Sequence, residues 1–285
     1  MAAMRAQSVP HFMQKKTYNI IMSVTQQYLA KAGEILSRVK EQELQIQQVA
    51  QIFARSILNG RMVHLFGSGH SRMMVEEMWP RYGSFPGFNP IVELSLSFHN
   101  LVVGANGQRQ AMFLENVPGF AARILRNFDT SPQDSALVIS SSGCNVVPIE
   151  IAEEFKKRNI KVVALVSKKH LEGSTSKKSD GKKLTDFADF VLDTGAPLGD
   201  AMIYLDGLDS PVSPGSTLGG VLLINCIKAE VAKILHENGR SPKVLSSGKI
   251  VGEQRAEDLF ESAYDEHAHL IAKLYRDIGN KSAKE

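Results

Sequence analysis

The amino-acid sequence predicts an α/β fold, a three-layer sandwich in which a five-stranded parallel sheet lies between helices. Five short apolar segments, most of them rich in β-branched residues, are typical of buried strands. Amphipathic helical segments separate several of these strands. Turns of small residues follow two of the strands and precede a helix. Because strands alternate with helices, we expect parallel pairing with helices on both faces of the sheet.

The composition is that of an ordinary globular protein. The chain has 285 residues, 43% hydrophobic and 22% charged, which suffices for one large α/β domain with extra helices or two small domains. A net charge of +3, from 33 basic and 30 acidic residues, favours neither a nucleic-acid nor a membrane partner. No apolar run reaches the roughly 18 residues of a membrane span. Because Cys144 and Cys226 lie far apart, we expect a cytoplasmic protein with free thiols.

We divide the chain into three parts. Residues 1–19 are expected to form a disordered tail or a leftover tag rather than a transit peptide, because Pro10 interrupts the segment and no clear amphipathic Arg/Ser pattern is present. Residues 20–250 form one domain that includes an N-terminal helical region, and residues 251–285 carry a C-terminal helix. Apolar residues recur at helical spacing over 20–58, and Asn59-Gly60 then ends that helix.

The remaining elements follow in order. The predicted strands are "MVHLF" (62–66), "NPIVEL" (89–94), "SALVIS" (135–140), "KVVALVS" (161–167) and "DFVLDT" (189–194). The predicted helices cover 70–82, 116–128, 146–160, 215–239 and 253–278. Pro148 is compatible with the helix over 146–160 because proline is tolerated in a first helical turn.

Three small-residue turns are candidates for one binding site. "GSGHS" (67–71), "SSSGCN" (140–145) and "GST" (215–217) each precede a predicted helix. Ligands of parallel sheets bind at the carboxyl ends of the strands, and backbone N–H groups at a helix start favour an anion. Taken alone, "GSGHS" is equally compatible with a tight strand-to-helix corner. Together with "SSSGCN", whose small residues fill a core poorly, it indicates a site for a phosphate or for sugar hydroxyls.

The motifs also indicate what the site lacks. Neither turn matches a dinucleotide fingerprint or a Walker loop. The two cysteines fit no metal-ligand spacing. We therefore expect neither a cofactor nor a metal ion.

The segments "GSGHS" and "SSSGCNVVPIEIAEEFKKRNIKVVALV" resemble the sugar isomerase (SIS) domain family, over roughly residues 20–240. The resemblance is strongest to SIS proteins labelled as phosphoheptose isomerases. It implies a flavodoxin-like sheet and a small-molecule sugar phosphate as ligand. The resemblance places these residues around the ligand: Gly67, Ser68, Gly69, Ser71, Ser140, Ser141, Ser142, Gly143, Asn145, Ser216 and Thr217.

The same resemblance implies a catalytic base. Phosphoheptose isomerases carry a glutamate in an "A-E-E-L-x-x-R-Y" helix, and "VEEMWPRY" aligns Glu76 with it. Aldose–ketose isomerisation through an enediolate requires such a base near carbon 2 and an acid for the sugar oxygens. Methionines near Glu76 could raise its pKa. From the residues alone, Glu76 and Glu77 are equally compatible with a solvated helix face.

The acid departs from the family pattern. The family's histidine in "V-H-I-K-V" corresponds to Cys226 in "NCIKA", and a buried thiol is a poor proton donor to a sugar oxygen. His70, inside the first turn, is the best-placed substitute. His99 and Glu230 are alternatives, and Glu93 and Glu115 remain further candidate carboxylates. His64 alternates within a strand, so we interpret it as a core residue.

Three functions remain open at this point. The first is a sugar-phosphate isomerase, the second a phosphosugar lyase of the muramic-acid-6-phosphate etherase type, and the third a phosphosugar sensor without turnover. The lysine-rich segment 168–183 could attract an anion, but we interpret it as a solvated loop. The apolar helices over 20–58, 215–239 and 253–278 exceed what one sheet needs, so we expect a homodimer or homotetramer.

Overall fold

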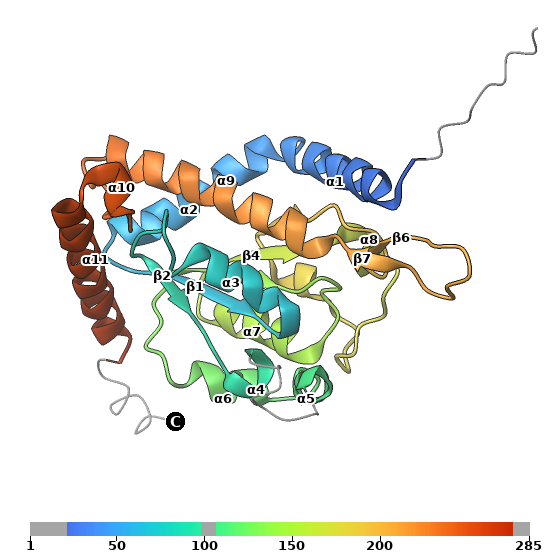
Figure 1. The fold of residues 1–285 in the computed structure, drawn as a ribbon. Helices are drawn as coiled ribbons and strands as arrows, with labels where there is room; N and C mark the ends of the chain where they lie inside the picture. Colours follow the sequence, from blue (N-terminus) through green and yellow to red (C-terminus); the bar gives the residue numbers. More distant parts are fainter. Residues whose placement is uncertain (1–21, 98–106, 276–285) are drawn as a thin grey trace, which may run out of the picture.

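The computed structural model describes residues 22–97 and 107–275. A central sheet lies between two layers of helices (Figure 1). Helices α2 (Glu43–Leu58) and α9 (Ser216–Glu237) pack together on one side of it. Helices α6 (Phe120–Leu125) and α7 (Val146–Lys157) cover the other side. The predicted three-layer α/β sandwich is therefore confirmed.

The sheet has five strands in the order β2-β1-β3-β4-β5, and every neighbouring pair is parallel. This order is the flavodoxin-like one. All five residues of β1 and of β3 are buried, as expected for strands covered on both faces. The strands are β1 Val63–Gly67, β2 Phe88–Pro90, β3 Ser135–Ile139, β4 Lys161–Val166 and β5 Phe190–Asp193.

The helices that follow neighbouring strands β1 and β3 lie on opposite faces of the sheet. Helix α3 (Arg72–Met78) contributes Met74, Val75 and Met78 to the core that includes α2 and α9. Helix α7 contributes to the second core, with Val147, Ile151 and Phe155. The chain therefore switches faces between β1 and β3, and a crevice at such a switch point is the usual ligand site of an open α/β sheet.

The N-terminal helical region differs from the prediction. Residues 20–58 were expected to form one helix, but α1 (Val24–Lys40) and α2 are separate. Gln42, which is buried, lies between them. Its side-chain amide accepts from Asp193 N at 2.7 Å and donates to Asp193 O at 2.8 Å. Gln42 thus pairs with the backbone of the edge strand β5, an interaction that requires the break.

Other elements are shorter than predicted. The helix over 70–82 is a 3-10 turn followed by α3, which ends at Met78, before Pro80. The strand over 89–94 is limited to β2, because α4 begins at Leu94. The helix over 116–128 is limited to α6, because Gly119 precedes it with a left-handed backbone. The last helix, α11, ends at Leu274.

Some elements were not predicted. The lysine-rich segment contains a short helix, and an antiparallel hairpin precedes α9. The remaining bounds within the described residues are α4 Leu94–Ser97, α5 Gly107–Leu114, α8 Lys168–Glu172, β6 Ala201–Ile203, β7 Val212–Pro214, α10 Gly248–Val251, α11 Glu253–Leu274 and the 3-10 helices Gly69–Ser71 and Leu184–Phe187. The expected tail over 1–19 lies outside the described residues.

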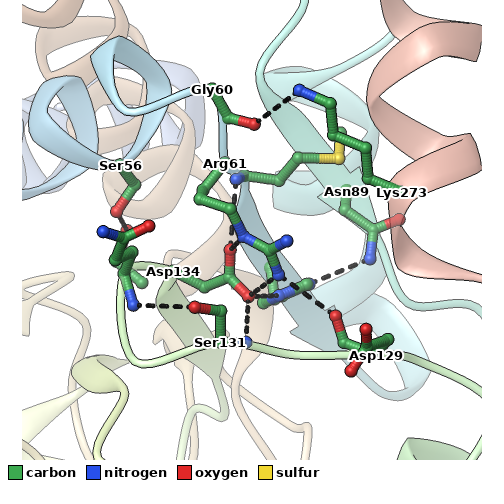
Figure 2. A network of polar contacts seen from close by, with 12 residues as sticks. Ser56, Gly60, Arg61, Asn89, Asp129, Ser131, Asp134 and Lys273 are labelled. Atoms are coloured by element: carbon green, nitrogen blue, oxygen red, sulfur yellow. Dashed lines mark hydrogen bonds and ion pairs between the residues drawn. The ribbon is translucent and has the colours of Figure 1, made fainter. Parts of the chain in front are cut away.

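A buried polar network joins the amino-terminal ends of the central strands (Figure 2). Arg61 donates to both carboxylate oxygens of Asp134, at 2.8 and 2.9 Å. The ring of His64 lies 3.2 Å from Asp134 through Nε2 and 3.0 Å from the Asn89 amide through Nδ1. His64 is fully buried and stacks on Phe155. The interpretation of His64 as a core residue is therefore confirmed.

Candidate functional site

A cavity of about 390 Å³ lies at the carboxyl edge of the sheet. This volume falls within the roughly 300–1,000 Å³ of typical small-molecule sites. The three predicted turns meet at the cavity, together with residues that follow β4 and β5. The predicted ligand residues that line it are Ser68, Gly69, His70, Ser71, Ser140, Ser141, Ser142, Asn145, Ser216 and Thr217.

Two predicted glycines shape the turns without lining the cavity. A Cβ at Gly67 would lie 2.6 Å from the carbonyl oxygen of Ser71, so only glycine lets the first turn close. Gly143 has a φ of 61°, and a Cβ there would lie 2.6 Å from Leu171. The serine turn therefore requires glycine both for its left-handed backbone and for its contact with α8.

The lysine-rich segment forms one wall of the cavity. His170 and Lys177 line it, and His170 Nδ1 lies 3.4 Å from the Ser141 hydroxyl. The backbone N–H of Lys177 donates to the Cys144 carbonyl at 2.9 Å, which anchors the segment beside the serine turn. Lys178 instead pairs with Glu153 and Asp180. The Lys177 side chain borders the cavity and is also exposed, in line with the interpretation of a solvated loop, whereas His170 is only partly exposed.

The N-terminus of α9 is closed by Asp200. Its carboxylate accepts from Gly215 N at 3.1 Å, from Ser216 N at 2.7 Å and from the Ser216 hydroxyl at 2.7 Å. Asp200 lines the cavity as well. The hydroxyl proton of Ser216 is therefore already donated within the protein.

Glu115 is a partly buried carboxylate of the site. Its two oxygens accept from the Ser68 hydroxyl and the Asn145 amide, each at 2.7 Å, so it bridges the first and second turns. Burial raises the pKa of Glu115, and this effect exceeds the opposing influence of the Ser68 hydroxyl and the Lys177 ammonium. The sequence analysis left Glu115 as one of several candidates, because spacing alone does not show that it faces the cavity.

Glu76 lies outside the cavity. Its side chain is 64% exposed and pairs with Arg72 one helical turn earlier. The other glutamate of the pair, Glu77, is mostly buried and contacts Arg81 and the Asn225 amide. Adjacent helical residues point about 100° apart, so the two carboxylates face different surroundings. Glu76 aligns with the base of the family, but its side chain does not line this cavity.

The other acid candidates lie elsewhere. Cys226 is exposed, contrary to the expectation of a buried thiol. Partial desolvation of the thiol, and secondly the negative charge of Glu230, raise the pKa of Cys226. Neither Cys226 nor Glu230 lines the cavity. Glu93 accepts from the backbone of Ser95 at the start of α4. His99 lies outside the described residues.

The part of the chain that the structure describes contains neither a metal-binding cluster nor a membrane-spanning helix. Across residues 22–97 and 107–275, no group of three or more His, Cys, Asp or Glu residues could hold a metal ion. In the same part of the chain, no helix combines the length and the apolar character needed to cross a membrane.

Comparisons with known proteins agree with the sequence motifs. A family model described as the SIS domain matches residues 27–167. A UPF0309 protein of Halalkalibacterium halodurans is 33% identical over 235 residues, which cover 81% of this chain and 94% of the relative. A UPF0309 protein of Thermoanaerobacter pseudethanolicus is 32% identical over 79% of this chain and 91% of the relative. Phosphoheptose isomerase from Neisseria gonorrhoeae aligns at 14% identity with a TM-score of 0.45, over 72% of this chain and 95% of that structure.

Proposed function

Because the chain belongs to the SIS domain family and to the UPF0309 proteins, we propose that it binds a sugar phosphate and interconverts its aldose and ketose forms. One observation carries the proposal: the partly buried carboxylate Glu115 lies in a cavity lined with hydroxyls and bridges two of its turns. The cavity thus combines donors for an anionic, hydroxyl-rich ligand with a base for proton transfer.

The phosphate binds where the serine turn meets α7. Ser140, Ser141 and Ser142 supply hydroxyls, and the start of a helix favours an anion. Asn145, at the N-cap of α7, makes no side-chain cap to its own helix. Lys177 adds a positive charge in the same wall of the cavity. The sugar then extends from the serine turn toward α9 and the first turn.

Glu115 acts as the base. Its raised pKa strengthens it as a proton acceptor, while the Ser68 and Asn145 donors hold the carboxylate in position. It removes the proton from the carbon next to the carbonyl group, the electron pair of that C–H bond forms the double bond of the enediolate, and Glu115 then returns the proton to the former carbonyl carbon. His70 or His170, which both line the cavity, transfers the proton between the sugar oxygens.

A sensor without turnover is the second candidate function. The residues that correspond to the base and the acid of phosphoheptose isomerases, Glu76 and Cys226, both lie outside the cavity. A protein that only binds the ligand needs neither group. The two functions differ in a single measurable event, the exchange of a carbon-bound proton with solvent.

The experiment measures binding by thermal shift and exchange by the entry of solvent deuterium at carbon 2, followed by NMR. The wild-type protein is expected to be stabilised by sugar phosphates and to catalyse exchange. Glu115→Gln is expected to keep binding and to lose about a hundredfold to ten-thousandfold in exchange rate. The exchange rate of the wild type should fall on acidification, because only the ionised Glu115 accepts a proton. The fall should occur at a higher pH than an ordinary glutamate would give, because the pKa of Glu115 is raised.

Glu76→Gln is the matched control, since it makes the same chemical change on an exposed side chain. It is expected to leave exchange unchanged, and loss of exchange in this variant alone would instead identify Glu76 as the base. If the wild type binds sugar phosphates without catalysing exchange, the sensor is the supported function and the isomerase is ruled out. If no sugar phosphate stabilises the protein, the ligand class is wrong.

We also propose that residues 20–250 act as one phosphosugar-binding domain and that the chain self-associates into a homodimer or homotetramer. Exposed apolar side chains on α1 support self-association: Leu29 is 62% and Leu36 is 40% exposed. Exposed apolar groups of this size on one helix face are typical of an interaction surface.

A further inference from the structure

Two helix N-termini reach the cavity from opposite faces of the sheet. Helix α7 begins at Asn145 and packs in the second core, whereas α9 begins at Ser216 and packs in the first. Residues at both helix starts line the cavity. A ligand whose phosphate lies at α7 therefore has its far end near α9.

The two N-termini differ in charge. At α7, the serine turn supplies hydroxyl donors, and the positive charge of Lys177 offsets the Glu115 carboxylate that accepts from Asn145. At α9, the Asp200 carboxylate already accepts from two backbone N–H groups and the Ser216 hydroxyl. A carboxylate at a helix N-terminus offsets the positive end of the helix dipole. The α9 end of the cavity therefore favours an anion less than the α7 end does.

We infer that Asp200 determines specificity: it restricts the ligand to sugar monophosphates whose end opposite the phosphate is neutral or cationic, and it excludes sugar bisphosphates. This inference rests on the proposed function, because it takes the phosphate to bind at α7. A second phosphate group at the α9 end would lie beside the Asp200 carboxylate. Two like charges that are brought together on binding reduce the binding free energy enough to reject a wrong ligand.

The variant Asp200→Asn tests the role of the charge with little change in shape. Asparagine tolerates the left-handed backbone of this position, where φ is 72°. Its side-chain oxygen can still accept from Gly215 N and Ser216 N, and its amide can donate to the Ser216 hydroxyl. Asp206→Asn is the matched control, because it removes the same charge from an exposed position of the hairpin.

Affinities for fructose 6-phosphate and fructose 1,6-bisphosphate are measured by calorimetry on the full chain. The wild type and Asp206→Asn are expected to bind the monophosphate at least about tenfold more tightly than the bisphosphate. In Asp200→Asn the preference is expected to shrink by about tenfold, mainly through tighter bisphosphate binding. Melting temperatures of the unliganded variants show whether the cap of α9 is retained.

The outcomes separate the two proposals. If the wild type binds both compounds equally, or if Asp200→Asn keeps the full preference, Asp200 does not set specificity and the proposed function stands. If neither compound nor any other sugar phosphate binds, the proposed function fails, and the role of Asp200 fails with it. A preference that shrinks equally in Asp206→Asn would show a general charge effect and also overturn the inference.

Discussion

At the scale of single residues, the surroundings of a carboxylate decide what it can do. Glu115 and Asp134 are both largely enclosed, but their partners differ. Glu115 has neutral donors as its hydrogen-bond partners, and burial raises its pKa. Burial also favours the neutral form of Asp134, but the stronger combined effect of His64, Arg61 and the Ser131 backbone lowers its pKa to about 2. The first suits proton transfer, and the second suits a permanent charge that holds strands together.

Asp134 predicts a pH-dependent contribution to stability. Its pKa is about 2 in the fold against an ordinary value of 3.8, so the folded state favours its ionised form. The contribution is about 2 kcal/mol, is fully present above pH 3.8, and is lost as the pH falls toward 2. Asp134→Asn leaves Arg61 without its carboxylate partner and is expected to lower the free energy of unfolding by about 3 kcal/mol at neutral pH.

Urea unfolding between pH 6 and pH 3 measures this effect. The difference in free energy of unfolding between wild type and Asp134→Asn should narrow as the pH falls below about 4, since the unfolded wild type then binds a proton at Asp134 that the folded state resists. Asp209→Asn, in the exposed hairpin, is the control and should change stability by less than about 0.5 kcal/mol. A constant difference between wild type and Asp134→Asn across the pH range would contradict the assignment.

The residues of the serine turn could be grouped from sequence because the local chain sets their shared location. Ser140, Ser141, Ser142 and Asn145 form one turn, so their shared location follows from a few consecutive residues. Glu115 comes between two short helices and reaches the cavity through tertiary packing. No local sequence pattern predicts that contact. Likewise, helical periodicity predicts on which face of its helix Glu76 lies, but not whether that face meets the cavity.

At the scale of elements, close packing of α9 against β5 builds one end of the site. A Cβ at Gly219 would lie 1.9 Å from the carbonyl oxygen of Thr194, and Thr194 lines the cavity. The helix can approach the end of β5 this closely only because Gly219 has no side chain. The N-terminus of α9, with Ser216 and Thr217, is thereby brought to the cavity.

Gly219→Ala is expected to force α9 away from the sheet. The free energy of unfolding should fall by about 3 kcal/mol, and ligand affinity should fall with it, because the α9 end of the cavity moves. Gly33→Ala is the matched control: Gly33 lies within α1, and a Cβ there meets nothing within 4 Å. It should raise stability by about 0.5–1 kcal/mol. Chemical unfolding of both variants checks this, and equal effects would contradict it.

Element boundaries were less predictable than element types. Periodic apolar residues continue across Gln42, so the sequence pattern favours one helix over 20–58. The break depends on the contact between Gln42 and Asp193, which are far apart in the chain. The hairpin before α9 has strands of only three residues each, too short for an alternating pattern to be recognised.

At the scale of the whole molecule, the sheet and the place of the site were predictable together. Alternation of strands and helices implies parallel strands, and parallel strands bring their following turns to one edge. The three turns could therefore be assigned to one site without knowledge of side-chain contacts. The alternation of strands and helices does not predict how chains assemble, because assembly depends on side chains at the outer surface of the helices.

Self-association through α1 is the prediction at this scale. Leu29 and Leu36 of α1 are exposed and lie seven residues apart, and Met22, which precedes the helix, is exposed as well, while Ile35 and Val39 are buried against the domain. A seven-residue apolar repeat is the seam of helix pairs. We expect light scattering to show a dimer or tetramer for the wild type, and a smaller species for Leu29→Glu combined with Leu36→Glu, because charges on the seam would be buried without partners.

Ile250→Glu, which changes an 83% exposed residue of α10, should keep the wild-type mass. An unchanged mass in the double variant would show that this face of α1 is not the interface, and a monomeric wild type would remove the proposed assembly altogether.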